Sequence, residues 1–544
     1  MSGLRRKPGG HQQHGRATSV TAAGPPGIAV PLAAAPIVVL VGLMVWRGWS
    51  AGRAGPATAI VALVIAIAWF DVGADSGGTI RAMAGAAAEA LFVAATILSI
   101  LLPALALHRL QDRAGAVAVV RSHLLAATGD RLVVVIVIGW FFALFIEGAA
   151  GFGTPVALAA PLLVGLGISP STAVVATLVG HAAGVSFGAV GTPLLTQLRL
   201  TGADAGDLTR ATAIYHLSIS WIFCFFLIAV VSRDIPGQQL SQWRYGALAA
   251  GSFLAPFLLI AWLVGAELPT LGGALVGAIV FLAFVRRDQH RARATHVVDH
   301  ASVAVRRDRK RGHADRLSLG TALSPYLVLV GLVGVTRLVA PVRGALQRIE
   351  LKWELVGGFS GAVQPLYHPA VLLVAAFLGA CIACRATLVE AVAASRHAAG
   401  QLSKAMAGLV SVLFVARLMS HAAMTEELAA AASHAGRAWP LLAPSVGALG
   451  TFVTGSATSS NVLFTEFQET TATAGGLDVV PVLGAQGFGA AVGNMICPHN
   501  IVAASATVGL RGQEGAVLRR TGLIACVALV AGGVAALATT RSAP

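Results

Sequence analysis

The sequence predicts an all-α, polytopic membrane protein made of two pseudo-repeats with broken or re-entrant helices. Three observations lead to this prediction. Of the 544 residues, 56% are hydrophobic and only 11% are charged, whereas a soluble domain carries about 25% charged residues. Apolar runs recur along the whole chain, each near the ~20 residues that cross a bilayer. Glycine- and proline-rich stretches interrupt these runs at two corresponding places.

The apolar runs define roughly 12–15 hydrophobic segments, some of them re-entrant. Their expected ranges are 29–46, 54–71, 87–107, 132–147, 150–167, 171–192, 213–231, 244–264, 268–285, 319–340, 368–384, 404–423, 440–460, 477–497 and 521–540. We expect a first transmembrane half at 28–285 and a second at 319–544. The tail at 1–27 contains Gly, Gln, His and Pro and is expected to be disordered. It lacks the apolar region and cleavage site of a signal peptide.

The net charge of +15 does not indicate a nucleic-acid-binding protein. Its basic residues lie between the apolar segments, with few aromatic residues among them. The largest cluster is the loop at 286–318, which the positive-inside rule places in the cytoplasm. If 150–167 crosses the membrane, the loop holding Arg109, Arg113, Arg121 and Arg131 lies inside as well, and the N-terminus lies outside. If 150–167 is a re-entrant hairpin, those arginines lie outside. The first arrangement is favoured.

Several other function classes lack support in the sequence. All five cysteines fall in apolar segments, and Cys381 and Cys384 form a lone CxxC without a second ligand pair. We therefore interpret them as small buried hydrophobic residues and expect no metal site. No GxxxxGK[ST] motif is present, so ATP hydrolysis is not expected. A membrane-embedded enzyme would need a nucleophile–base pair or a metal cluster, and no HExxH motif appears. We expect neither enzymatic activity nor a cofactor.

Two regions combine glycine and proline breaks with small polar residues. They are 145–202 and 450–512. Each contains a first break, at Gly148–Pro155 and at Thr454–Asn461, and a second break closed by proline, at Gly180–Pro193 and at Gly484–Pro498. Paired interruptions of this kind indicate the binding site of a secondary transporter. Unpaired backbone groups are tolerated at membrane depth only where they line a cavity or are buried in protein. The alternative is that these glycines only allow close packing between helices.

At these residues the sequence resembles the L-lactate permease family. The resemblance rests on FIEGAAGFGTPVALAAPLLVGLG (145–167), GTFVTGSATSSNVLF (450–464) and GNMICPHNIVAASATVGL (493–510). It implies a bacterial inner-membrane permease that carries L-lactate, and related 2-hydroxymonocarboxylates such as glycolate, together with protons. The chain departs from the family where Ala457 replaces a frequent Asp and where His181 replaces a common Asn. These departures bear on the substrate range and on the coupling ion.

Three ionisable residues in apolar segments are candidates for function, because a charge within the membrane is costly. Glu147 directly precedes the first break and could exchange the coupled proton, or it could be a structural carboxylate. His181 could form a proton relay with Glu147, or it could be a hydrogen-bonded core residue. Arg417 could bind the substrate carboxylate or pair with Glu147. Its alternative is to extend toward the interface, near His421 and Glu426.

Hydroxyl and amide side chains cluster at the breaks and suit a 2-hydroxy acid. They are Thr454, Ser456, Ser459, Ser460 and Asn461, with Thr154 and Asn494 as further candidates to line the site. Serine and threonine can also hydrogen-bond within their own helix without any functional role. Glu466 and Glu469 are expected at the interface.

The sequence thus predicts a secondary active transporter that imports L-lactate and related 2-hydroxymonocarboxylates with protons. Its expected partners are the small carboxylate substrate, protons and the lipid bilayer, and no nucleic acid. Its expected location is the bacterial inner membrane. Another small organic anion as cargo, or sodium as the coupling ion, remains an alternative.

Overall fold

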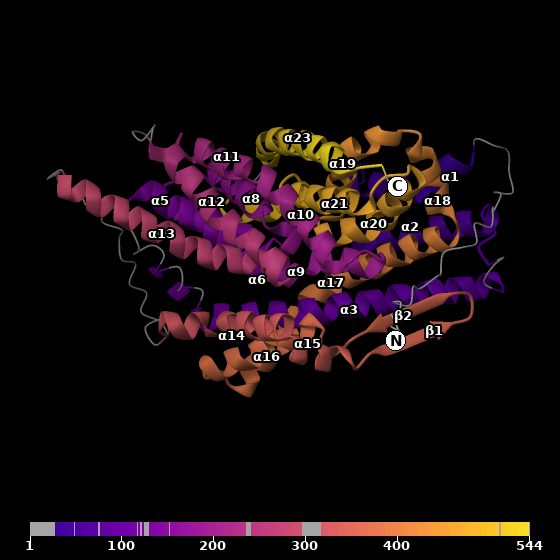
Figure 1. Cartoon of the computed structure of the whole chain (residues 1–544), viewed down its shortest axis with the longest axis horizontal. Helices are drawn as coiled ribbons and strands as arrows, with labels where there is room; N and C mark the ends of the chain where they lie inside the picture. Colours follow the sequence, from indigo (N-terminus) through magenta and orange to yellow (C-terminus); the bar gives the residue numbers. More distant parts are fainter. Residues whose placement is uncertain are drawn as a thin grey trace, which may run out of the picture.

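The computed structural model describes residues 28–47, 49, 51–73, 77–116, 118–119, 122–123, 130–151, 153–235, 241–295, 317–510 and 513–542. This part of the chain is almost entirely helical, and the long helices α3, α13 and α17 lie along the long axis of the molecule (Figure 1). The prediction of an all-α membrane protein is confirmed. The expected disordered tail at 1–27 lies outside the described residues.

The first half begins with three helices and continues into the first pseudo-repeat. Its elements are α1 (Ala29–Val45), α2 (Ala51–Ala68), α3 (Thr79–Arg113), α5 (Arg131–Ile136), the π-helix η1 (Val137–Phe142), α6 (Ala143–Ala149), α7 (Thr154–Gly165), α8 (Pro170–Ala182), the 3₁₀ helix η2 (Val185–Phe187), α9 (Gly188–Leu200), α10 (Ala205–Ile219), α11 (Trp221–Val231), α12 (Ser241–Leu263) and α13 (Pro269–Thr295).

The second half contains a β-hairpin and the second pseudo-repeat. Its elements are α14 (Leu319–Leu338), α15 (Ala340–Gln347), β1 (Leu351–Leu355), β2 (Phe359–Val363), α16 (Pro369–Ala383), α17 (Leu388–His421), α18 (Met424–Ser433), the 3₁₀ helix η4 (Gly436–Ala438), α19 (Trp439–Thr454), α20 (Ala457–Ala474), α21 (Val479–Asn494), α22 (Pro498–Thr507) and α23 (Glu514–Thr539).

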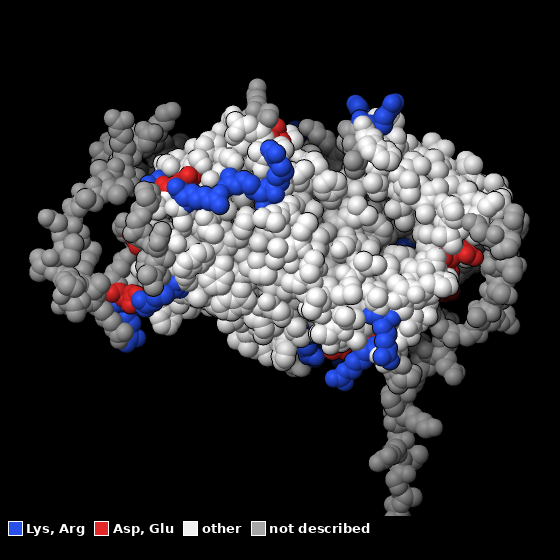
Figure 2. All heavy atoms as spheres, turned by 90° about the horizontal axis from the view of Figure 1, so that it is seen from above, with Lys and Arg blue, Asp and Glu red and all other residues white. Residues whose placement is uncertain are grey.

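Seven helices among the described residues are long and apolar enough to cross a bilayer, or up to nine if each of two bent pairs forms one span. The bent pairs are α8 with the η2–α9 segment, at 61°, and the two parts of α17, at 46°. Shorter apolar helices lie at Ala29–Leu43, Gly52–Ala68, Thr154–Gly165 and Pro369–Ala383. Figure 2 shows few charged side chains across the middle of one face of the molecule, as contact with hydrocarbon requires.

The hairpin of the first pseudo-repeat starts and finishes at the same end of the molecule, which we call the basic end. The Arg131 Nε at the start of α5 donates to the Leu166 carbonyl after α7, at 3.0 Å. The helices from α5 to α7 therefore run inward to the break at 150–153 and return. Ser169, before α8, donates its backbone N–H to Asp234 Oδ2. The broken span of α8, η2 and α9 then runs to the opposite end, which we call the strand end.

The second pseudo-repeat enters from the strand end, so the two repeats are inverted. Trp439 Nε1, at the start of α19, donates to Gln468 Oε1 near the end of α20, at 2.9 Å. The hairpin of α19 and α20 therefore turns at its break, Gly455–Ser456, and returns to its starting end. The broken span of α21 and α22 runs to the basic end, where Arg520 of the following helix donates to Ser171 Oγ at 3.1 Å. Inverted repeats are typical of secondary transporters.

Of the two arrangements considered for 150–167, the re-entrant hairpin is observed, because α7 returns to the start of α5, whereas Arg131 lies at the basic end, as the crossing arrangement required. Arg131 lies at the same end as the Arg244–Asp288 ion pair near the basic segment, because α5 packs against α12. Gln111, near the end of α3, also lies there, since its Nε2 donates to the Ala322 carbonyl at 3.0 Å. Arg121 lies outside the described residues. Of the basic segment expected as a loop at 286–318, the first part continues α13 as helix to Thr295, and residues 296–316 lie outside the described residues.

The antiparallel hairpin of β1 and β2 was not expected from the sequence. Its turn uses Gly357 and Gly358, both at positive φ, where glycine avoids the clash of a Cβ atom. The hairpin lies along α3 (Figure 1). Ser360 donates its backbone N–H to the Glu89 Oε1 of that helix at 3.0 Å. This hairpin covers part of the strand end.

Candidate transport site

The first helix break places the N-terminus of α7 inside the protein. Gly151 and Gly153 adopt φ of 59° and 75°, the left-handed region that ends α6 and redirects the chain. Thr154 then starts α7, and its hydroxyl donates to the Gly151 carbonyl at 2.6 Å. The first backbone N–H groups of a helix have no partner within the helix and attract negative charge. The break therefore forms an electropositive position close to Glu147.

Glu147 lies in the last turn of α6 and is 4% exposed. Its carboxylate packs against the α-carbon of Gly188, the first residue of α9, and lies beside Gly151. Within the described part of the chain it forms no hydrogen bond or ion pair. A buried carboxylate without a partner is costly when charged. The absence of side chains at both glycines provides the space that Glu147 occupies.

The second break distorts the start of α9. Ala189, Val190 and Gly191 adopt φ of 42°, 55° and 78° in succession. Left-handed backbone at alanine and valine is strained and persists only where the surrounding structure enforces it. Here the α-carbon of Gly191 packs directly on the backbone of Ala266 and Glu267, which would exclude a larger residue.

His181 joins the two pseudo-repeats. Its Nδ1 lies 2.7 Å from the Thr177 carbonyl and its Nε2 lies 3.1 Å from Asn494 Oδ1 at the end of α21. Asn500, in α22, donates to the same Asn494 oxygen at 2.8 Å. The α-carbon of Gly153 lies beside the Asn500 side chain. The first hairpin tip, the end of α8 and the break between α21 and α22 therefore meet.

Most of the hydroxyl and amide candidates in the second hairpin serve its own structure. Thr454 donates to the Gly450 carbonyl at 2.7 Å, and Ser456 caps α20 by accepting from the Ser459 backbone N–H. Ser460 donates to the Gly447 carbonyl at 2.7 Å, and Asn461 donates to the Pro193 carbonyl of the other repeat at 3.0 Å. Ser459 is half-buried, and its hydroxyl has no hydrogen bond within the described residues.

Arg417 lies in a separate charged cluster. Its Nη1 is 2.7 Å from Glu466 Oε1 and 4.0 Å from Glu89 Oε2, and His421 Nε2 is 2.8 Å from that Glu89 oxygen. Its carboxylate partners in the described chain are therefore Glu466 and Glu89, and it forms no ion pair with Glu147. Glu466 was expected at the interface. That expectation was wrong, because its side chain is only 16% exposed and pairs with Arg417.

A Ser–His pair beside the site was not expected from the sequence. Ser186 Oγ, in η2, lies 2.8 Å from His216 Nε2 and donates to the Gly487 carbonyl of α21 at 2.9 Å. The His216 ring is fully buried against Phe257 and Phe488. A histidine inside the apolar segment 213–231 was the available signal. The pair ties the break in the first broken span to α10 and α21.

No group in the described part of the chain is arranged to hold a metal ion, by the criterion of three gathered His, Cys, Asp or Glu side chains. The site is thus made of helix termini, one carboxylate, one imidazole, and amide and hydroxyl groups. This set suits an anion and a proton.

The chain can be compared with known proteins over nearly its whole length. Residues 30–354 and 359–541 match the family described as L-lactate permease. The chain belongs to the L-lactate permease family. It is 29% identical over 488 residues to an L-lactate permease of Salmonella typhimurium, covering 85% of this chain and 87% of that protein.

Two further relatives show the range of the family. An L-lactate permease of Bacillus subtilis is 28% identical over 513 residues, covering 87% of this chain and 89% of the relative. The glycolate permease GlcA of Escherichia coli is 29% identical over 499 residues, covering 86% and 88%. The chain is thus a multi-pass membrane permease and not an enzyme.

Proposed function

We propose that this permease imports L-lactate and related 2-hydroxymonocarboxylates, such as glycolate, together with protons across the bacterial inner membrane. The observation that carries the proposal is the buried, unpartnered Glu147 beside two helix breaks. The names of the family and of the relatives support the cargo, since they include both an L-lactate and a glycolate permease.

The substrate carboxylate is bound near the N-terminus of α7, where the partial positive charge of the helix end stabilises an anion. Thr154, Ser456 and Ser459 lie at the starts of α7 and α20 and are only partly buried. Ser459 and Thr154 supply hydroxyl groups to the substrate 2-hydroxyl. Asn494 and Asn461 hold the two repeats together around it.

Glu147 takes up the coupled proton. While it is charged and buried, movement of the site across the membrane is opposed by the cost of desolvating the charge. Protonation removes that cost, so the site reorients when both proton and anion are bound. His181 is the second group that can exchange the proton, in a relay with Glu147, and Asn494 holds its imidazole in place.

Arg417 takes a different role from the substrate contact that its position in the sequence suggested. The Arg417 guanidinium is already paired with Glu466 and Glu89. Arg417 therefore holds α17 to α20 and α3. It contacts the substrate only if these ion pairs open during transport.

Uptake of labelled L-lactate by proteoliposomes, with and without an inward proton gradient, tests the proposal. Glycolate, pyruvate and succinate serve as competitors. We expect the gradient to stimulate uptake, and glycolate to compete more strongly than succinate. Absence of L-lactate uptake by folded protein under both conditions would contradict the cargo. Stimulation by a sodium gradient alone would contradict proton coupling.

A further inference from the structure

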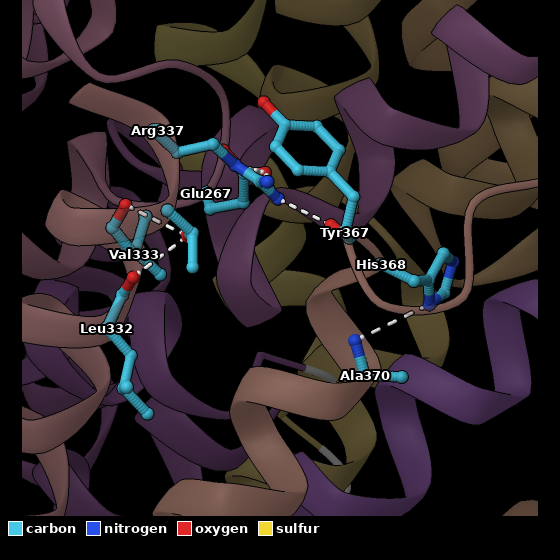
Figure 3. A network of polar contacts seen from close by, with 8 residues as sticks. Glu267, Leu332, Val333, Arg337, Tyr367, His368 and Ala370 are labelled. Atoms are coloured by element: carbon cyan, nitrogen blue, oxygen red, sulfur yellow. Dashed lines mark hydrogen bonds and ion pairs between the residues drawn. The ribbon is translucent and has the colours of Figure 1, made fainter. Parts of the chain in front are cut away.

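A second polar site lies at the strand end, away from the helix breaks. A cavity of about 250 Å³ opens there between α9, α14, β2 and the loop before α16. Arg199, Glu267, Arg337, Tyr367 and His368 line it, and Figure 3 shows the last four of these together. Neither the family resemblance nor the transport site described above accounts for this cluster.

Arg337 is held rigidly and still has unused donor capacity. Its Nε and Nη2 donate to Glu267 Oε1 at 2.9 and 2.6 Å, and Nη2 also donates to the Tyr367 carbonyl at 3.0 Å. Its guanidinium carbon lies 3.6 Å from the centre of the Tyr367 ring. The side chain is 5% exposed, yet Nη1 is buried without any hydrogen-bond partner. A buried donor left unpaired is costly, so a ligand that accepts from Nη1 would be stabilised.

Both acidic side chains that line the cavity are already paired. Glu267 compensates Arg337, and Glu350 at the cavity wall pairs with Lys352 at 3.0 Å. Arg199 is half-buried at the end of α9 and has no hydrogen bond or ion pair within the described residues. Its charge is therefore left without a partner beside the cavity.

His368 contributes a third donor. Its Nδ1 accepts from the Ala370 backbone N–H at the start of α16, so the proton of the neutral ring lies on Nε2. That Nε2 is buried and has no partner. Burial, together with the charges of Arg199 and Arg337, lowers the pKa of His368 to about 4. At pH 7 the ring is therefore neutral, and its Nε2–H is available to an anion.

We propose that this cavity is an external vestibule that binds a small carboxylate anion before it reaches the helix breaks. The carboxylate accepts hydrogen bonds from Arg337 Nη1, the Arg199 guanidinium and His368 Nε2. Three donors favour an anion, and guanidinium groups match the geometry of a carboxylate. The volume is below the usual range for drug-sized ligands, which favours a small substrate.

The cavity lies at one end of α9 and the break beside Glu147 lies at the other. Gly188 contacts Glu147, Gly191 contacts the backbone of Ala266 and Glu267, and Arg199 reaches the cavity. The positive-inside rule places the strand end outside the cell, because the basic segment follows α13 at the opposite end. That the bound anion is a substrate awaiting import rests on the proposed function. That the cavity binds a carboxylate does not depend on it.

Protection from chemical modification tests the binding directly in the wild-type protein. Phenylglyoxal modifies arginine, and peptide mass spectrometry reports each position separately. We expect L-lactate, glycolate or acetate to slow modification of Arg199 at least threefold, and chloride to have little effect. Exposed Arg343 on α15, which does not line the cavity, serves as the internal control. Equal rates at Arg199 with and without carboxylate would overturn the proposal.

Transport kinetics provide a second test. In right-side-out vesicles, Arg199→Gln should raise the external KM for L-lactate about tenfold or more, since hydrogen bonds to charged groups are strong, with the maximal rate within about twofold of wild type. Arg199→Lys should have an intermediate KM and Arg343→Gln an unchanged one. An unchanged KM in Arg199→Gln would contradict a vestibule. Carboxylate protection of Arg199 in a protein that does not transport L-lactate would contradict the proposed function and leave the binding site supported.

Discussion

His181 Nε2 lies 3.1 Å from Asn494 Oδ1, although 313 residues separate the two positions. This contact joins the end of α8 in the first repeat to the end of α21 in the second. The Nδ1 of His181 faces the Thr177 carbonyl and therefore carries a proton. The amide of Asn494 can present either its oxygen or its nitrogen to Nε2, so it can pair with His181 in both protonation states.

Replacing Asn494 by leucine should weaken both stability and transport. Asn494→Leu removes the partner of His181 Nε2 and one of the two acceptors of Asn500 Nδ2, which keeps the backbone carbonyl of residue 494. An unpaired buried group costs about 1–3 kcal/mol. We expect a lower unfolding temperature in detergent and at least tenfold slower L-lactate uptake. Asn494→Gln, which keeps an amide, should retain part of the uptake. Wild-type uptake by Asn494→Leu would show that the contact between the repeats is dispensable.

Packing of the second hairpin against its broken span depends on a glycine. The α-carbon of Gly489 in α21 lies against the backbone carbonyl of Pro444 in α19. Overpacking of this kind costs about 1–3 kcal/mol, so Gly489→Ala should lower the unfolding temperature measurably. Gly515→Ala, at the start of α23, meets no atom within 4 Å and is the matched control. Equal unfolding temperatures for the two variants would contradict the close contact between α19 and α21.

The Arg417–Glu466 pair should behave as a structural unit. Arg417→Gln leaves Glu466 without its 2.7 Å partner, and breaking a buried pair costs about 3 kcal/mol or more. The double variant Arg417→Gln/Glu466→Gln removes both charges and should recover much of the lost stability and uptake. Thermal unfolding and uptake of the wild type and of these two variants form the measurement. A stable double variant that has lost all affinity for L-lactate would instead identify Arg417 as the counter-ion of the substrate.

The helix breaks could be predicted well from the sequence, because clustered glycine and proline interrupt an apolar helix directly. The entry of the two hairpins from opposite ends could not be predicted, since it depends on contacts such as Arg131 with Leu166. Thr454 and Ser460 matched a binding pattern, but serine and threonine bond to their own helical hairpin equally well. Arg337 was not predicted because an arginine at the end of an apolar segment resembles an ordinary interfacial residue.

The most direct test of the account is proton movement during L-lactate transport by wild-type protein and by Glu147→Gln. Proteoliposomes containing a pH-sensitive dye report proton entry, and labelled L-lactate reports uptake and exchange. Exposed Glu354 on β1 provides the control, Glu354→Gln. We predict that wild type and Glu354→Gln move protons with L-lactate, and that Glu147→Gln exchanges internal for external L-lactate without proton entry or gradient-driven accumulation. Proton-coupled accumulation by Glu147→Gln at the wild-type rate would contradict the assignment of Glu147 as the proton carrier.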